Sequence, residues 1–235
     1  AAEAPLSPAD LARLSRLSFL YALFVEEGRE DAPRLLPVAL PDTAYLPPEV
    51  SRILKYTGKT NELFTRLMIN IALNSGAYAD EPLPRLLDPV AGRGTTLFEA
   101  LVWGCSAAGI EIGDKAVGDT AAYFKRFLET EKYKHTFHKE RISGENRSFT
   151  AVMHTFALAP SKEDWPGGNT RQLRLVAGNS RYADAFFRKN TFHALVGDLP
   201  YGVQHGNVTR ENQSSLTRNP RELLTACLPA WRKVL

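Results

Sequence analysis

The chain has 235 residues, of which 44% are hydrophobic and 23% are charged, as in an ordinary globular protein. This length suits one α/β domain with a small extension. No apolar run approaches the roughly 18 residues needed to cross a bilayer, so we expect no membrane partner. The formal net charge of +3 permits a polyanionic partner such as RNA without requiring one.

The N-terminus and the cysteines indicate the cellular compartment. Residues 1–10 lack the basic and then apolar layout of a secretory signal peptide. Cys105 and Cys227 form neither a metal-ligand spacing nor a disulfide framework, and each lies in an apolar context. We therefore expect two buried free thiols and a reducing, cytoplasmic location.

Residues 1–54 are expected to form a small N-terminal extension that caps the main domain. Leucines at helical spacing predict a helix within residues 1–20. The overlapping segment 19–25 fits either a continuation of that helix or a short strand. Prolines make residues 28–50 mostly irregular and leave room for one short strand at 35–40.

Residues 55–235 are expected to form the main domain. Gly58-Lys59-Thr60 is similar to the end of a phosphate-binding P-loop, but Ile53 stands where that motif needs its first glycine. We therefore reject a P-loop. An amphipathic helix follows this segment and ends near Asn74.

The most informative stretch of the chain is residues 86–96. A short apolar strand ends in Asp88, passes through a turn that contains Gly92 and Gly94, and opens a helix at Thr95. This is how a buried parallel strand leads into a helix in nucleotide-binding α/β units. The two glycines leave room for a ligand to lie against the backbone.

Alternating helices and strands follow, which is typical of an α/β fold with a mostly parallel sheet and helices on both faces. The expected elements are a helix at 95–103, a strand at 106–112, a helix at 116–131, strands at 172–177 and 192–197, and helices at 182–187 and 220–235. The apolar segment 149–158 is expected to pair with the strand at 172–177, or with its neighbour, as an inserted hairpin. Four parallel strands make a short sheet, so we expect further strands beyond residue 235.

The carboxyl ends of the expected strands carry polar residues. These are Asp88 with its glycine turn, Glu111, the pair Asn179-Ser180, and the segment Asp198-Leu199-Pro200-Tyr201. Parallel strands end at one edge of a sheet, where such folds bind ligands, so we expect these residues to lie together. Glu111 follows the glycine turn at about the spacing at which dinucleotide-binding folds place an acid for the ribose.

These motifs resemble the Rossmann-like S-adenosylmethionine (SAM)-dependent methyltransferases that methylate exocyclic amino groups. Asp88-Pro89-Val90-Ala91-Gly92-Arg93-Gly94-Thr95 is similar to their first SAM-binding motif. Gly109-Ile110-Glu111 is similar to their second motif, in which the acid binds the ribose hydroxyls. Asp198-Leu199-Pro200-Tyr201 is similar to their Asp-Pro-Pro-Tyr catalytic motif. With Gly202 added, that segment is similar to the tRNA guanine-N2 methyltransferases that usually carry a THUMP domain.

The resemblance implies a Rossmann-like class I methyltransferase domain over residues 55–235, with SAM as cofactor and RNA, specifically tRNA, as substrate. It assigns catalysis to Asp198, Pro200 and Tyr201, and it implies no metal. The cofactor-binding residues that it implies are Asp88, Pro89, Ala91, Gly92, Gly94, Thr95, Glu111, Ile112, Asn179, Ser180 and Asp198.

Some positions depart from the family pattern or extend it. Leu199 replaces the first proline of the catalytic motif. Asn179-Ser180 stands where an Asp often reads the adenine amino group, and Asp184 lies near enough in the sequence to take that role. Lys59 and Thr60 precede the first strand of the domain, in a region that related enzymes often use near the methionine end of SAM.

The catalytic residue types suit a poor nucleophile. The lone pair of an exocyclic amino nitrogen is delocalised into the base ring. The Asp198 carboxylate and a backbone carbonyl beside Pro200 can accept its two N–H groups and aim the lone pair at a methyl group. Tyr201 offers a flat face on which a base can stack, worth about 1–3 kcal/mol in comparable sites. A base in a duplex must be flipped out to reach such a pocket.

Other functions stay open on the sequence alone. A DNA adenine-N6 or cytosine-N4 methyltransferase shares the motifs but usually carries a sizeable target-recognition region, which we do not find. An NAD-dependent oxidoreductase needs a third glycine where Leu97 stands. A catalytically silent RNA-binding protein with the same fold is the non-enzyme alternative.

A basic region with interleaved aromatic residues lies between residues 123 and 147. Such a region can follow a phosphate backbone. Several glutamates dilute its charge, so a solvated helix face is the favoured interpretation. Its basic residues are Lys125, Arg126, Lys132, Lys134, Lys139, Arg141 and Arg147.

Overall fold

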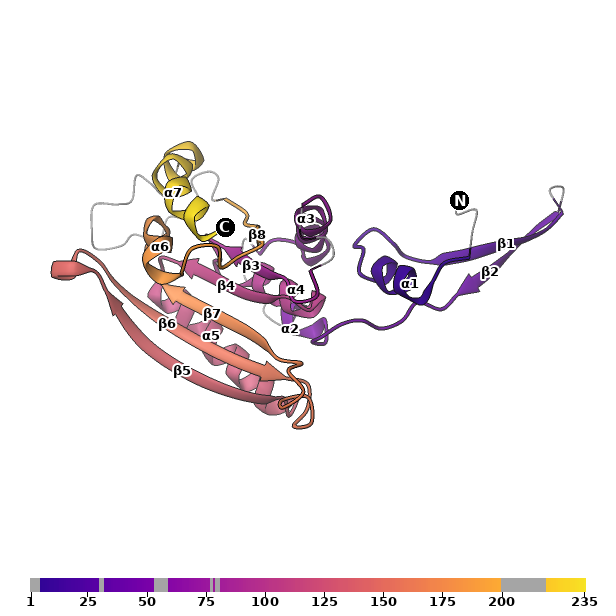
Figure 1. The fold of residues 1–235 in the computed structure, drawn as a ribbon, viewed down its shortest axis with the longest axis horizontal. Coiled ribbons are helices and arrows are strands. Elements are labelled where there is room, and N and C mark those ends of the chain that lie inside the picture. Colours follow the sequence, from indigo (N-terminus) through magenta and orange to yellow (C-terminus); the bar gives the residue numbers. More distant parts are fainter. Residues whose placement is uncertain (1–4, 30–31, 53–58, 77, 79–80, 200–218) are drawn as a thin grey trace.

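The computed structural model describes residues 5–29, 32–52, 59–76, 78, 81–199 and 219–235. They form an α/β domain on a six-stranded mixed sheet, and an N-terminal arm that extends away from it (Figure 1). The mostly parallel sheet that the sequence predicts is therefore present.

Four parallel strands form the middle and one edge of the sheet. In spatial order they are β7 (Arg171–Ala177), β4 (Ser106–Glu111), β3 (Arg85–Asp88) and β8 (Ala194–Leu195). The other edge is an antiparallel hairpin of β5 (Lys134–Ser143) and β6 (Thr150–Ala159), in which β6 pairs with β7. The hairpin expected from the apolar segment 149–158 is thus confirmed.

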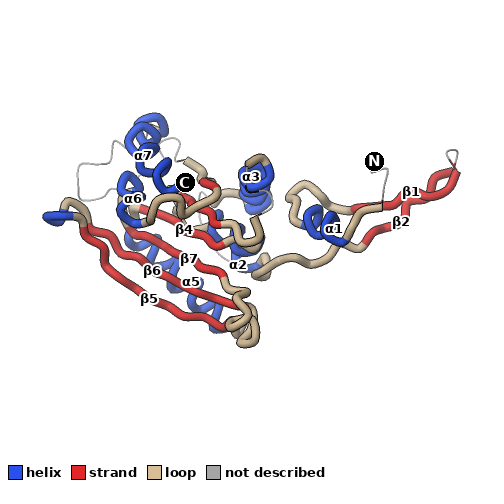
Figure 2. Tube along the Cα trace, viewed as in Figure 1, coloured by secondary structure: helices blue, strands red, loops and turns tan. Residues whose placement is uncertain are grey.

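Helices cover both faces of the sheet, as predicted (Figure 2). One face carries α2 (Glu49–Arg52), α3 (Glu62–Asn74), α4 (Thr95–Trp103) and α5 (Asp114–Thr130). The other carries α6 (Ala183–Phe186) and α7 (Pro220–Val234), with the short 3-10 helix η2 (Ser180–Tyr182) before α6. Side chains alternate along β3, so Leu86 joins the core under α4 and α5 while Leu87 joins the core under α6 and α7.

Local sequence sets the ends of the helices beside the candidate site. The side chain of Asn61 caps α3 by accepting hydrogen bonds from the backbone N–H groups of Leu63 (2.9 Å) and Phe64 (3.1 Å). α4 begins after Gly94 and ends at Gly104, with φ angles of 86° and 101° that glycine adopts without strain. The N-terminus of α4 therefore directly follows the glycine turn.

The arm contains α1 (Pro8–Ser15) and a two-stranded antiparallel sheet of β1 (Leu23–Arg29) and β2 (Ala32–Val38). Of residues 19–25, only 23–25 are in a strand and none continues the helix, and the short strand expected at 35–40 lies at 32–38 instead. Asn70 on α3 attaches the arm to the domain. Its side chain accepts a hydrogen bond from the N–H of Ser18 (2.9 Å) and donates one to the carbonyl of Arg16 (3.2 Å).

Two expectations about secondary structure are wrong. Within the basic region 123–147, Lys125 and Arg126 lie on the exposed face of α5 as expected, but most of residues 132–147 form the exposed edge strand β5 rather than a helix. An edge strand without a buried face needs no apolar alternation, so its polar sequence carries no strand signal. The last strand, β8, is shorter than the expected 192–197, because it pairs with β3 only through Ala194 and Leu195.

The two cysteines are buried free thiols, as expected. Cys105 lies in the core under α4 and α5, and Cys227 lies in the core under α6 and α7. No helix in the described ranges combines the length and apolarity needed to span a membrane.

Candidate functional site

The carboxyl edge of the parallel strands brings three acidic residues together. Asp88 ends β3 and lies beside Gly109 of β4, while Glu111 ends β4 beside Ala177 of β7. Asp198 follows β8 at the same edge, and its charge and that of Glu111 both act on Asp88. The sequence prediction that these acids gather at one edge is therefore confirmed.

Asp88 is the innermost of the three acids, with only 2% of its surface exposed. Its Oδ1 accepts a hydrogen bond from the N–H of Val90 (3.0 Å), and the Thr96 side chain also hydrogen-bonds to the carboxyl group. Burial raises the pKa of Asp88 to about 7, against the lowering effect of these two hydrogen bonds. Asp88 therefore organises the turn from within instead of facing solvent.

The turn after β3 is open where a ligand would lie. Gly92 has a φ of 52°, and a Cβ built on it would have no neighbour within 4 Å. The backbone N–H of Ala91 donates to the carbonyl of Ile110 (2.9 Å), which fixes the turn against β4. No side chain caps the N-terminus of α4. The exposed backbone of Gly92 thus lies beside the N-terminus of α4, where such folds bind ligands.

Glu111 holds the outer side of the glycine turn. Its Oε2 accepts a hydrogen bond from the N–H of Gly92 (3.0 Å), and its Oε1 accepts one from the N–H of Gly113 (2.8 Å). Each carboxylate oxygen has a second lone pair, so the pair of ribose hydroxyls predicted for this acid still has acceptors. Burial raises the pKa of Glu111 despite these hydrogen bonds.

Gly109 has a structural role that sequence reasoning missed. A Cβ on Gly109 would lie 2.5 Å from Cδ1 of Leu97 and 2.7 Å from Cβ of Ala91. Leu97 is the residue that replaces the third glycine of a dinucleotide fingerprint. Strand β4 and helix α4 can therefore lie close together because β4 has a glycine at position 109, and the Leu97 side chain of α4 packs over that glycine. The small residues at the start of β4, Ser106-Ala107-Ala108-Gly109, were the sequence signal that could have indicated this close packing.

Asp198 is held by a residue from a distant part of the chain. The hydroxyl of Thr60 donates a hydrogen bond to its Oδ2 at 2.8 Å. Lys59, the neighbour of Thr60, points elsewhere: its Nζ donates to the carbonyl of Ser51 and forms an ion pair with Glu62 (2.5 Å). Of the two residues expected near the site, only Thr60 places its side chain on an acid of the sheet edge.

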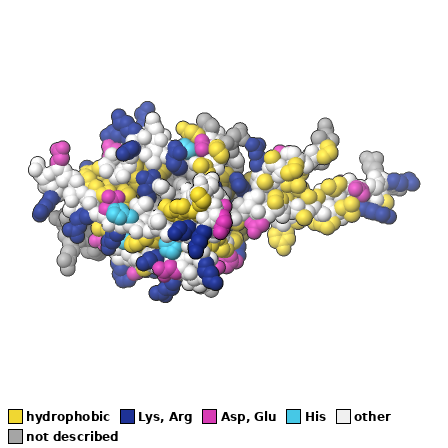
Figure 3. Space-filling view, turned by 60° about the horizontal axis from the view of Figure 1, so that its bottom comes forward, with side chains coloured by type: hydrophobic (Ala, Val, Ile, Leu, Met, Phe, Trp, Pro, Cys, Tyr) yellow, Lys and Arg dark blue, Asp and Glu magenta, His cyan; other side chains and the backbone are white. Residues whose placement is uncertain are grey.

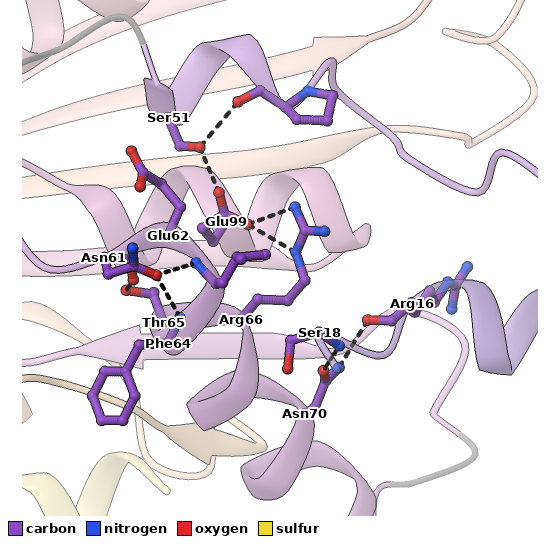
Figure 4. A network of polar contacts seen from close by, with 12 residues as sticks. Arg16, Ser18, Ser51, Asn61, Glu62, Phe64, Thr65, Arg66, Asn70 and Glu99 are labelled. Carbon is purple, nitrogen blue, oxygen red and sulfur yellow. Dashed lines mark hydrogen bonds and ion pairs between the residues drawn. The ribbon is translucent and has the colours of Figure 1, made fainter. Parts of the chain in front are cut away.

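A buried polar network supports the segment that carries Thr60 (Figure 4). Glu99 of α4 is 1% exposed and receives hydrogen bonds from Ser51 (2.5 Å) and from Nε and Nη2 of Arg66 (3.1 and 3.0 Å). Because Ser51 also binds Lys59 through its carbonyl, the network links α2, α3 and α4 around the Thr60 segment. Sequence reasoning did not identify this network.

The polar residues after β7 have partners in this structure. The side chain of Asn179 caps η2 by accepting a hydrogen bond from the N–H of Arg181 (3.0 Å). The hydroxyl of Ser180 accepts one from Nε1 of Trp231 (2.9 Å) in the core. Asp184, the alternative adenine contact, forms an ion pair with Lys233 (2.6 Å).

The remaining predicted site residues are divided between the edge and the undescribed part of the chain. Pro89 and Ala91 lie in the turn, Thr95 is a buried residue at the start of α4, and Ile112 follows Glu111. Pro200, Tyr201 and Gly202 lie outside the described residues. Within the described ranges, no three His, Cys, Asp or Glu side chains are arranged to hold a metal ion.

No protein-family model matches the sequence, and no curated protein matches it significantly.

Proposed function

We propose that the chain is a SAM-dependent N-methyltransferase with a Rossmann-like class I fold, which modifies an exocyclic amino group of a base in RNA. The preferred target is guanine N2 of tRNA. The observation that carries the proposal is the convergence of Asp88, Glu111 and Asp198 at one sheet edge, around a glycine turn and an uncapped helix. The resemblance of the motifs to this enzyme family gives the choice of cofactor.

The residues fit SAM in three places. The open turn at Gly92, just before the N-terminus of α4, leaves backbone against which the cofactor can lie. Gly94 instead packs against the core, because a Cβ on it would lie 3.3 Å from Cγ2 of Thr120. Glu111 accepts the ribose hydroxyls. Asn179-Ser180, at the end of β7, borders the adenine, while its side chains cap η2 and accept a hydrogen bond from Trp231.

Asp198 orients the methyl acceptor. Its Oδ2 is engaged by Thr60, which leaves Oδ1 to accept an N–H of the base amino group. That hydrogen bond draws the nitrogen towards tetrahedral geometry. The Asp198 carboxylate can then accept the proton that the nitrogen loses when it is methylated. Pro200 and Tyr201 supply the carbonyl and the stacking face that the family motif assigns to them. SAM supplies a methyl group activated by its sulfonium, so the protein contributes positioning and electrostatics.

Methylation of unmodified tRNA tests the proposal. Protein, methyl-labelled SAM and tRNA transcripts are incubated, with duplex DNA as the competing substrate, and the nucleosides are separated by mass spectrometry. We expect label in N2-methylguanosine, and we expect Asp198→Asn to abolish it even at saturating SAM. Label in N6-methyladenine or N4-methylcytosine of DNA would favour the DNA-methyltransferase alternative. SAM binding without transfer to any nucleic acid would favour the silent RNA-binding alternative.

A further inference from the structure

The two-stranded sheet of the arm has both faces exposed to solvent. Val25 and Leu36 on one face are 48% and 44% exposed, and Phe24 and Leu35 on the other are 49% and 62% exposed. Figure 3 shows hydrophobic side chains spread along the arm. An isolated two-stranded sheet is marginally stable in water, and further strands or a packed face are needed to stabilise it. Within the described residues, no further strand pairs with the two-stranded sheet of the arm.

Prolines block the free edge of β2. Pro33 pairs with Gly28, and Pro37 pairs with Phe24. Two residues of a hydrogen-bonded antiparallel pair exchange both N–H groups, which proline cannot do, so these are non-hydrogen-bonded pairs. The backbone groups of residues 33, 35 and 37 consequently point away from β1. Two of these three positions have no N–H, and this edge cannot accept a strand.

The free edge of β1 has no such block. By the same alternation, the N–H and C=O groups of Phe24 and Glu26 point away from β2. Alternating donors and acceptors at strand spacing are satisfied by another extended polypeptide. The arm thus has one edge open to strand addition and one edge closed to it.

We propose that β1 of this chain pairs antiparallel with β1 of a second copy about a twofold axis at Val25. Phe24 and Glu26 are equally distant from Val25, so each meets the other in the partner subunit as a hydrogen-bonded pair. The edge is therefore complementary to itself, as a twofold interface requires. The result is a continuous four-stranded sheet with the blocked β2 strands at its outer edges.

The acidic residues of β1 select this register. A twofold axis at Glu26 or at Glu27 places two identical carboxylates directly opposite each other, which is destabilising. With the axis at Val25, Glu26 lies opposite the partner subunit's Phe24, and Glu27 lies opposite the partner subunit's Leu23. This is the longest antiparallel register that keeps the carboxylates apart. It also brings the two exposed Val25 side chains together.

Sedimentation equilibrium of the whole chain tests the proposal. We expect the wild-type protein to be a dimer at about 100 µM and to dissociate on dilution. Glu26→Pro removes an outward N–H from the open edge and should raise the dimer Kd at least about tenfold. Leu35→Pro is the matched control, because it removes the outward N–H of the residue that pairs with Glu26, on the edge already blocked. It should leave the dimer Kd unchanged.

A second pair of variants tests the register without removing any N–H group. Val25→Lys places two ammonium groups at the axis and should weaken the dimer, with recovery at high salt. Leu36→Lys, on the same face of β2, should have a much smaller effect. Circular dichroism melting checks that every variant stays folded. A monomeric wild-type protein at about 100 µM, or equal effects of the matched variants, would overturn the proposal.

Discussion

The hydroxyl of Thr60 lies 2.8 Å from Oδ2 of Asp198 and donates a hydrogen bond to it, although 138 residues separate them in the chain. Removal of this donor should release the carboxylate that orients the methyl acceptor. We expect Thr60→Val to lower kcat about tenfold or more, the range for one hydrogen bond to a charged group. KM for SAM should stay within about twofold, because the Thr60 hydroxyl is engaged by Asp198 in the structure.

The control for this prediction is Thr60→Ser, which keeps the hydroxyl and removes one methyl group. Thr60→Ser should keep most of the wild-type kcat, because it keeps the hydroxyl. If threonine acted only through its shape, Thr60→Val would instead be the better substitute. A kcat for Thr60→Val equal to that of the wild type would contradict the positioning role of Thr60.

Asp88 should make stability depend on pH. Burial raises its pKa from 3.8 in the unfolded chain to about 7 in the folded protein. Between these two pH values, Asp88 is protonated in the folded state and ionised in the unfolded state. The stabilising contribution of this proton is therefore complete below pH 3.8 and is lost as the pH rises through 7. Wild type should lose about 4 kcal/mol relative to Asp88→Asn between pH 4 and pH 8. Urea unfolding across this range measures the difference, and parallel curves would refute the prediction.

The fold of the domain and the candidate site could be predicted from the sequence to different degrees. Glycine at positions 94 and 104 and the apolar runs before Asp88 and Glu111 are local signals, so the central helices and strands were placed well. The convergence of the acids followed from the rule that parallel strands share a carboxyl edge. Strand β5 was missed because an exposed edge strand has no apolar face to reveal its period.

Contacts between distant segments could not be predicted in this way. The hydrogen bonds from Thr60 to Asp198 and from Trp231 to Ser180 join residues that are far apart in the sequence. No local sequence pattern around either residue indicates the partner. Likewise, the need for Gly109 arises from the Leu97 side chain on a different element. Such contacts depend on the packing of α3, α4 and α7 on the sheet, which no local pattern encodes.

Ser180 should matter for stability more than for the cofactor. Its hydroxyl and carbonyl both accept from Nε1 of the buried Trp231, at 2.9 and 3.2 Å. Ser180→Ala leaves the carbonyl as acceptor, so we expect a loss of about 1 kcal/mol in the free energy of unfolding. The Kd for SAM should change by less than about twofold, because the hydroxyl is already engaged. A large rise in that Kd without any loss of stability would show that the hydroxyl serves the cofactor instead.

Removal of only one partner of the ion pair between Arg66 and Glu99 should destabilise the folded protein strongly. The Glu99 side chain is fully buried, whereas that of Arg66 is 22% exposed. Arg66→Met leaves a buried carboxylate with only the Ser51 hydrogen bond, so we expect a loss of about 3 kcal/mol in urea unfolding. The double variant Arg66→Met/Glu99→Gln removes the unpaired charge and should recover part of this loss. A double variant less stable than Arg66→Met would contradict the explanation.

The central claim is that the edge formed by the glycine turn and Glu111 holds SAM, and titration calorimetry of the whole chain with SAM tests it most directly. We predict one binding site per chain. Glu111→Ala should weaken binding about 10- to 100-fold, because it loses charge-assisted hydrogen bonds to the ribose hydroxyls. Folded wild-type protein that binds no SAM, or an affinity that Glu111→Ala leaves unchanged, would contradict the account.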